Sequence, residues 1–186
     1  MPAPAITTSA YVLHNLGLAA GFGGSLFGRV ALNPSARLIS DKQDRARIVN
    51  AAWNGYNIIN AVGLGITAAT WLVGRAAING RSISPTAHKL VILKDVLMGA
   101  TLAGGAVNLF SGAFLAKRAF EDGIPMESGS KAADEAPEDV KKATRLVNRL
   151  GVFTLVTMAG LIGVSTWLDN QASTSTKWNL FARLLP

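Results

Sequence analysis

Long runs without a charged residue alternate along this chain with short clusters of charged residues. The uncharged runs cover residues 1–28, 48–74, 96–116 and 150–168. Each run has the roughly 20 residues that a helix needs to cross a bilayer. They lack the Lys and Glu residues that recur at every turn on the exposed face of a soluble amphipathic helix. We therefore predict an all-α, polytopic membrane protein with four transmembrane helices, at about residues 9–31, 48–74, 94–117 and 147–168.

Lysine and arginine gather on one side of this predicted membrane domain, which takes in the whole chain, residues 1–186. Of the 18 basic residues, 12 flank the loops at 32–47 and 118–145, and 6 lie on the other side. Loops rich in Lys and Arg stay in the cytoplasm. We therefore expect both termini, the loop at 75–88 and an interfacial segment at 169–186 to lie outside. The stretch "MPAPAITTSA" has no basic start, so we expect the first span to be retained and not cleaved as a signal peptide.

Short matches between the two halves of the chain indicate an internal repeat. "RIVN" at residues 47–50 is echoed by "RLVN" at 145–148, and "TWL" occurs at both 70–72 and 166–168. Upstream, "SLFG" at 25–28 corresponds to "NLFSG" at 108–112. We predict two helical hairpins of one design, related by an axis along the membrane normal. The alternative is a chance likeness between apolar helices. The loop at 118–145 is expected to begin as a solvated loop before "APEDVKKATRLVNRL" resumes a helix.

Four glycines form a stripe on the first predicted helix. Gly17, Gly21, Gly24 and Gly28 follow one another at intervals of four, three and four residues, which places them on one face. Small residues allow two helix backbones to approach closely in lipid. We expect this face to pack against a neighbouring helix. The alternative is a groove that holds a lipid or a flat cofactor.

Four asparagines form a second stripe, on the second predicted helix. Asn50, Asn54, Asn57 and Asn60 share one side of this helix, and Asn60 lies roughly 20 Å along it from Arg47. An amide in hydrocarbon needs a hydrogen-bond partner. Three destinations are open: backbone carbonyls of the glycine-striped helix, a partner subunit, or a water-filled path. We favour the first, because amide bonds between membrane helices are common.

Candidate chemistry is sparse. His14 is the one residue that we weigh as a cofactor ligand, for haem, chlorophyll or a quinone, against a purely structural role. The other histidine, His88, lies in "SISPTAHK", which predicts a helix start with Ser84 as N-cap and Pro85 at the first position. Aromatic side chains that we expect to anchor the membrane interfaces are Trp71, Trp167, Trp178 and Phe181.

Catalytic motifs are not found in the sequence. It has no cysteine, no His/Asp/Glu cluster with metal-ligand spacing and no phosphate-binding glycine loop. The net charge of +7 follows the predicted topology and forms no separate basic module, so we expect no nucleic-acid partner. Our leading hypothesis is a non-catalytic accessory or scaffold subunit of a larger complex, respiratory or photosynthetic, in a bacterial inner membrane or another energy-converting membrane. Lipids and other integral membrane subunits would be its partners.

Two alternatives belong to other classes of protein. One is a small membrane redox protein that holds haem, chlorophyll or a quinone at His14. The other is a small-solute transporter that uses the Asn50 to Asn60 stripe. The first predicts a visible absorption band, and the second predicts flux through liposomes that depends on Asn57 and Asn60.

Overall fold

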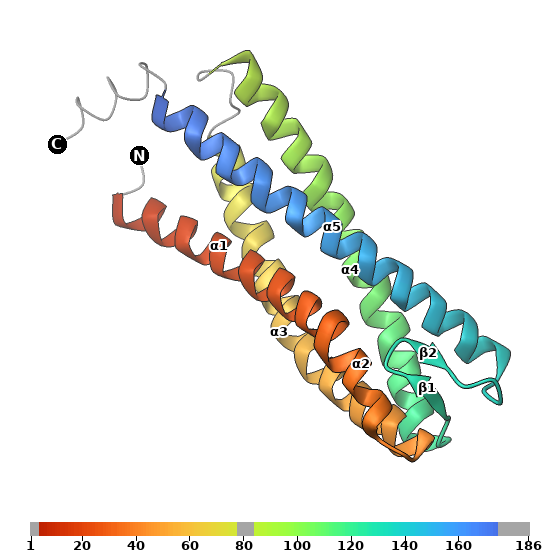
Figure 1. Ribbon diagram of the computed structural model, residues 1–186. Helices are drawn as coiled ribbons and strands as arrows, with labels where there is room; N and C mark the ends of the chain where they lie inside the picture. Colours follow the sequence, from red (N-terminus) through yellow and green to blue (C-terminus); the bar gives the residue numbers. More distant parts are fainter. Residues whose placement is uncertain (1–3, 78–83, 175–186) are drawn as a thin grey trace.

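The computed structural model describes residues 4–77 and 84–174 and is mostly helical (Figure 1). The long helices are α1 (Pro4–Phe27), α3 (Lys42–Ala77), α4 (Pro85–Glu121) and α5 (Glu138–Thr174). A π-helical segment (Gly28–Leu32), the short α2 (Asn33–Ser35) and a 3-10 turn (Ala36–Leu38) join α1 to α3. Between α4 and α5 lie two short antiparallel strands, β1 (Met126–Ser128) and β2 (Lys131–Ala132).

Three of the helices are long and apolar enough to cross a membrane, which indicates a membrane protein. These candidate spans are Lys42–Arg75, Pro85–Glu121 and Glu138–Gln171. At 1.5 Å per residue, the 36 residues of α3 extend about 54 Å, well beyond a hydrocarbon core of about 30 Å. The remaining predicted span corresponds to α1, which is shorter, at 24 residues.

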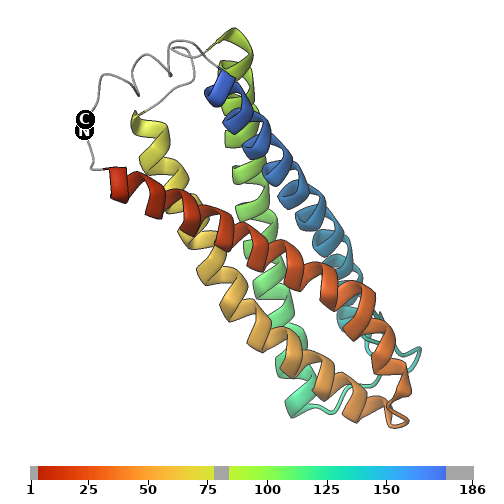
Figure 2. The same cartoon turned by 60° about the vertical axis from the view of Figure 1, so that its left-hand side comes forward.

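The helices pack as two pairs. α1 lies beside α3, and α4 lies beside α5, in both views of the bundle (Figures 1 and 2). One end of the bundle, here called the terminal end, holds Pro4, Ala77, Pro85 and Thr174. The opposite end, here called the hairpin end, holds α2 and the two strands.

The ends of α3, α4 and α5 lie further out than the hydropathy pattern predicts, because the flanking charged residues continue each helix beyond its apolar run, whereas α1 ends at Phe27 and passes into the π-helical segment. The predicted start of α4 is confirmed: the Ser84 side chain accepts a hydrogen bond from the Ala87 backbone N–H at 3.0 Å, and Pro85 is the first helical residue. At the other boundary, α4 runs on to Glu121 and α5 begins at Glu138. The start of α5 confirms the prediction that a helix resumes in "APEDVKKATRLVNRL", so only residues 122–137 of the predicted loop at 118–145 form the connection.

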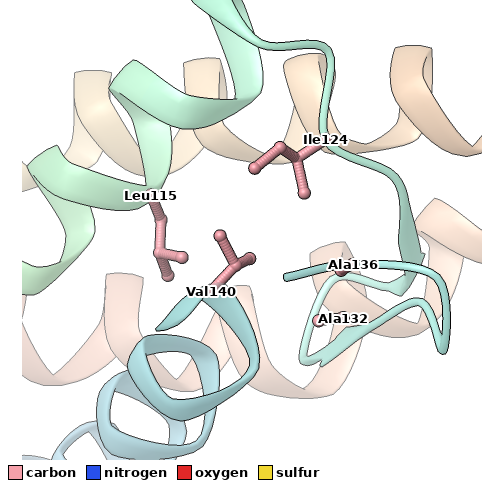
Figure 3. Packing of buried hydrophobic residues seen from close by; sticks show 5 residues of the cluster. All are labelled: Leu115, Ile124, Ala132, Ala136 and Val140. Atoms are coloured by element: carbon pink, nitrogen blue, oxygen red, sulfur yellow. The ribbon is translucent and has the colours of Figure 1, made fainter. Parts of the chain in front are cut away.

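This connection is a folded cap, and the expectation of a solvated loop is wrong for much of it. Ile124, Ala132, Ala136 and Val140 are buried with Leu115 of α4 in one apolar cluster (Figure 3). Strand β1 is held by Arg45 of α3, which is only 7% exposed and donates hydrogen bonds to the backbone oxygens of Met126 and Glu127 at 3.0 and 2.7 Å. The apolar residues scattered through this polar sequence bury themselves against the end of the bundle, and this orders the segment.

A further apolar cluster lies in the half of the bundle toward the terminal end. Leu18, Met98 and Leu161 form a cluster there, with Leu161 fully buried. Thr67 and Thr101 are also fully buried, and the Thr101 hydroxyl bonds to that of Thr157 at 2.8 Å. The half toward the hairpin end is packed differently, because it contains a cavity.

Candidate functional site: a polar cavity between the helices

A cavity of about 80 Å³ lies between the helices in the half of the bundle toward the hairpin end. Residues of α1, α3, α4, α5 and β1 line it, so its walls come from both helix pairs. One water molecule needs roughly 10–15 Å³ of such volume. The cavity therefore has room for several waters or for one small solute.

The lining is rich in amides. The four asparagines of the α3 stripe all line the cavity, and three more asparagines come from other elements: Asn33 of α2, Asn108 of α4 and Asn148 of α5. The expectation that the stripe bonds to backbone carbonyls of the glycine-striped helix is wrong. The Gly21 carbonyl of α1 accepts its hydrogen bond from the Tyr56 hydroxyl, and the Asn50 amide donates within α3, to the Ala46 carbonyl at 2.8 Å. Beside the stripe, the rings of Tyr56 and Trp53 face α1, and Asn60 also lies against α1, at Gly21.

Three buried polar atoms in the cavity wall have no hydrogen-bond partner in the described chain. They are the Oδ1 atoms of Asn60 and Asn108 and the hydroxyl oxygen of Thr144. Leaving a buried polar group unsatisfied costs about 1–3 kcal/mol. Buried polar groups in native structures are normally bonded to protein or to ordered water. These three atoms therefore point to a polar occupant of the cavity.

Arg29 also lines the cavity and comes from the π-helical segment that follows α1. Its guanidinium donates to both oxygens of Asn148, from Nη1 to Oδ1 at 3.1 Å and from Nη2 to the backbone oxygen at 2.8 Å. Gly151, one turn further along α5, leaves room for this group, because a Cβ atom there would lie 3.1 Å from Nη2. Single π-helical turns are frequent at functional sites.

The two ends of the cavity differ. Met126, Gly129 and Ser130 of the strand hairpin cover one end. At the other end, the Asn60 Oδ1 and Met158 Sδ atoms both lie about 3 Å from the position of a Cβ on Gly21, and Met158 is only 1% exposed. Asn54 lines the cavity and is exposed, so the cavity reaches the surface of the bundle at this amide.

Lining residues recur at constant intervals in the two halves of the chain. Residues 98 positions apart that both line the cavity are Val49 and Val147, Asn50 and Asn148, Trp53 and Gly151, and Tyr56 and Thr154. Residues 83 positions apart that both line it are Ser25 and Asn108, Arg29 and Gly112, and Asn33 and Ala116. The first interval is that of "RIVN" and "RLVN", and the second is that of "SLFG" and "NLFSG". Asn108 and Asn148 lie within these motifs, and this signal was open to sequence reasoning, which missed both as site residues.

The glycine stripe lies along the contact between α1 and α3. A Cβ on Gly17 would lie 2.3 Å from the backbone oxygen of Gly63, so the two backbones touch there. Gly24 and Gly28 face the rings of Tyr56 and Trp53, which would lie 2.0 and 2.3 Å from added Cβ atoms. Gly21, as described above, faces Asn60 at the inner end of the cavity.

His14 lies in the other half of the bundle and does not line the cavity. It is 5% exposed, and its Nδ1 atom contacts the Thr67 backbone oxygen at 3.0 Å, while Nε2 has no partner in the described chain. Trp71, one of the predicted interface anchors, is half-buried next to it and donates to Asp95 at 2.8 Å.

The other predicted interface anchors and a possible metal site can be compared directly with the structure. Trp167 is 53% exposed, whereas Trp178 and Phe181 lie outside the described residues. Within residues 4–77 and 84–174, no three His, Asp or Glu side chains gather as a metal site would require. Comparison of the chain with protein-family models, with curated proteins and with solved structures gives no match.

Proposed function

We propose that this protein binds a small polar solute in the asparagine-lined cavity and carries it across the membrane. The observation that supports this most is the set of unpartnered oxygens on Asn60, Asn108 and Thr144, which face a space large enough for such a solute. In this proposal α1 is the fourth span, the helix pairs are the two copies of a repeat, and the hairpin end is cytoplasmic. Transporters of this kind hold their substrates near the middle of the membrane, between repeated units.

The depth of the cavity supports the proposal. Asn50 and Asn60 are ten residues apart on α3, so the amides follow the helix for about 15 Å. Asn60 lies near the middle of the uncharged run at residues 48–74. Beyond it, Met158 and Leu161 close the bundle with side chains that are almost fully buried. These side chains bar a solute at Asn60 from the terminal end, as one of the two states of alternating access requires.

Flux through liposomes tests this function. Purified protein would be reconstituted, and the entry of glycerol, urea and glycerate would be compared with entry into protein-free liposomes. Asn60→Leu removes an amide and fills the inner end of the cavity, so we expect the flux of a transported probe to fall by about 10-fold or more. Ile59→Leu is the matched control, because Ile59 is the preceding residue and is 59% exposed. Flux that is absent for all three probes, or unchanged by Asn60→Leu, would contradict the proposal.

An accessory subunit of a larger membrane complex is the second candidate, and the exposed Asn54 favours it. An amide that faces hydrocarbon costs several kcal/mol, which a polar group of a neighbouring subunit would offset. This candidate predicts large subunits in fixed stoichiometry with the chain after purification from native membranes in mild detergent. A chain that purifies alone and transports a probe would favour the first proposal.

A further inference from the structure

The charge in the cavity lining is of one sign, positive. Of the described residues that line it, Arg29 is the only one with a charged side chain, and none is an acid. We infer that the cavity is a site for a small organic acid, whose carboxylate binds Arg29 and whose hydroxyl or amino groups donate to Asn108 and Asn60. This inference rests on the proposed function and names its substrate class.

Arg29 is held ready to bind an oxyanion. Its two hydrogen bonds to Asn148 fix the plane of the guanidinium and use only two of the five N–H donors of the group. The remaining donors include the paired geometry that matches a carboxylate. A lysine at this position would present a point charge without this fork.

No described carboxylate neutralises this arginine. It donates to both oxygens of Asn148, which are uncharged. Glu127, on the strand hairpin that covers the cavity, is exposed and forms an ion pair with Lys42 at 3.3 Å. A half-buried cation among amides is stabilised by an anion more than by a neutral solute, since the local dielectric constant is below that of water. The same charge disfavours a cationic solute.

Hydrogen-bond acceptors lie deeper in the cavity. Asn60 and Asn108 each present an unpartnered amide oxygen, and an oxygen accepts only from O–H or N–H groups. Arg29 and Gly21, which lies against Asn60, are eight residues apart, or about 12 Å along the helix. A compact molecule with a carboxylate at one end and hydroxyl or amino groups at the other matches this order of donors and acceptors. Glycerate has both features. Glycerol lacks the carboxylate, and propionate lacks the hydroxyl groups.

A phospholipid headgroup offers the same oxyanion chemistry, so the test must separate the two sources. Binding of labelled glycerate, glycerol and propionate would be measured for the full chain in nanodiscs of phosphatidylcholine and in nanodiscs that also contain phosphatidylglycerol. We expect glycerate to bind most tightly in both membranes. A loss of glycerate binding in the anionic membrane would identify the lipid as the occupant of Arg29 and would overturn the inference.

Two variants test the arginine itself. Arg29→Gln removes the charge, and Asn148→Asp keeps the arginine in place but sets a carboxylate beside its Nη1 atom. Each should weaken glycerate binding by about 10-fold to 100-fold, as expected for a lost hydrogen bond to a charged group, and should weaken glycerol binding far less, because glycerol has no carboxylate. Arg149→Gln is the control, because Arg149 is exposed, follows Asn148 and does not line the cavity.

The outcomes separate this inference from the proposed function. Glycerol that is bound or transported, with no preference for glycerate and no effect of Arg29→Gln, would overturn the inference and leave the proposed function standing. A chain that neither binds nor transports glycerate, glycerol or urea would overturn both. Loss of glycerate binding in Asn148→Asp, in protein that still binds glycerol, would support the inference even if Arg29→Gln fails to fold.

Discussion

The closest approach of α1 and α3 gives a prediction whose size follows from the structure. A Cβ atom on Gly17 would lie 2.3 Å from the Gly63 backbone oxygen and 2.4 Å from the Thr67 hydroxyl oxygen. Ordinary contact begins near 3.4 Å, so in Gly17→Ala the two helices must separate by about 1 Å. The obstructing oxygen belongs to the backbone of α3 and cannot rotate away.

That separation breaks specific interactions. His14 and Thr67 join the two helices next to Gly17, through the contact of Nδ1 with the Thr67 backbone oxygen at 3.0 Å and the bond from the Thr67 hydroxyl to the His14 oxygen at 3.2 Å. Hydrogen bonds between membrane helices average about 0.6 kcal/mol, so two contribute about 1.2 kcal/mol. Overpacking adds about 1–3 kcal/mol, and the better helix propensity of alanine offsets up to about 1 kcal/mol. We expect a net destabilisation of about 1–3 kcal/mol.

Gly23→Ala is the matched control. Gly23 lies on the same helix, is exposed, and has nothing within 4 Å of an added Cβ atom. The two variants make the same chemical change and differ only in what the methyl group meets. Unfolding in mixed detergent micelles, followed by circular dichroism as the denaturing detergent is increased, would give both free energies. If Gly17→Ala is as stable as Gly23→Ala, the close packing of α1 on α3 is refuted.

Two further predictions concern the strand hairpin and the membrane topology. Arg45→Ala should free the strand hairpin, because it removes the donor of two charge-assisted hydrogen bonds to the Met126 and Glu127 oxygens, worth about 1.5–3 kcal/mol each. Hydrogen exchange at residues 126–132 should accelerate in Arg45→Ala and not in the exposed neighbour variant Arg47→Ala, and equal exchange in both would contradict it. The sequence contains no cysteine, so single substitutions report topology. Lys131→Cys at the hairpin end and Lys89→Cys near the terminal end should react with an impermeant thiol reagent from opposite sides of the membrane, and labelling of both from one side would refute the four-span topology.

Local features of the helices could be read from the sequence. The start of α4 is visible because Ser84 and Pro85 act on the backbone within one turn. The apolar character of three long helices is visible because hydropathy adds along a run of neighbouring residues. The shared face of the four α3 asparagines follows from helical spacing alone.

The candidate site is formed by side chains from different helices, and the pattern within one helix does not predict which of them meet. In the sequence, Arg29 is one of several arginines at a predicted cytoplasmic boundary. The tertiary structure turns it toward Asn148, 119 residues away. The apolar residues of the 118–145 segment have no regular period, so their burial against Leu115 had no signal in the pattern.

The sequence by itself determined that the chain forms long apolar helices and which side chains share a helix face, because these properties depend on residues within a few turns of one another. Only the tertiary structure decided what each face meets. The glycine contact between α1 and α3 fixes how those helices lie, and Tyr56 and Trp53 then occupy the α1 side of α3. The asparagines line the gap that remains between the two helix pairs, and such a gap has no counterpart in the sequence of any single helix.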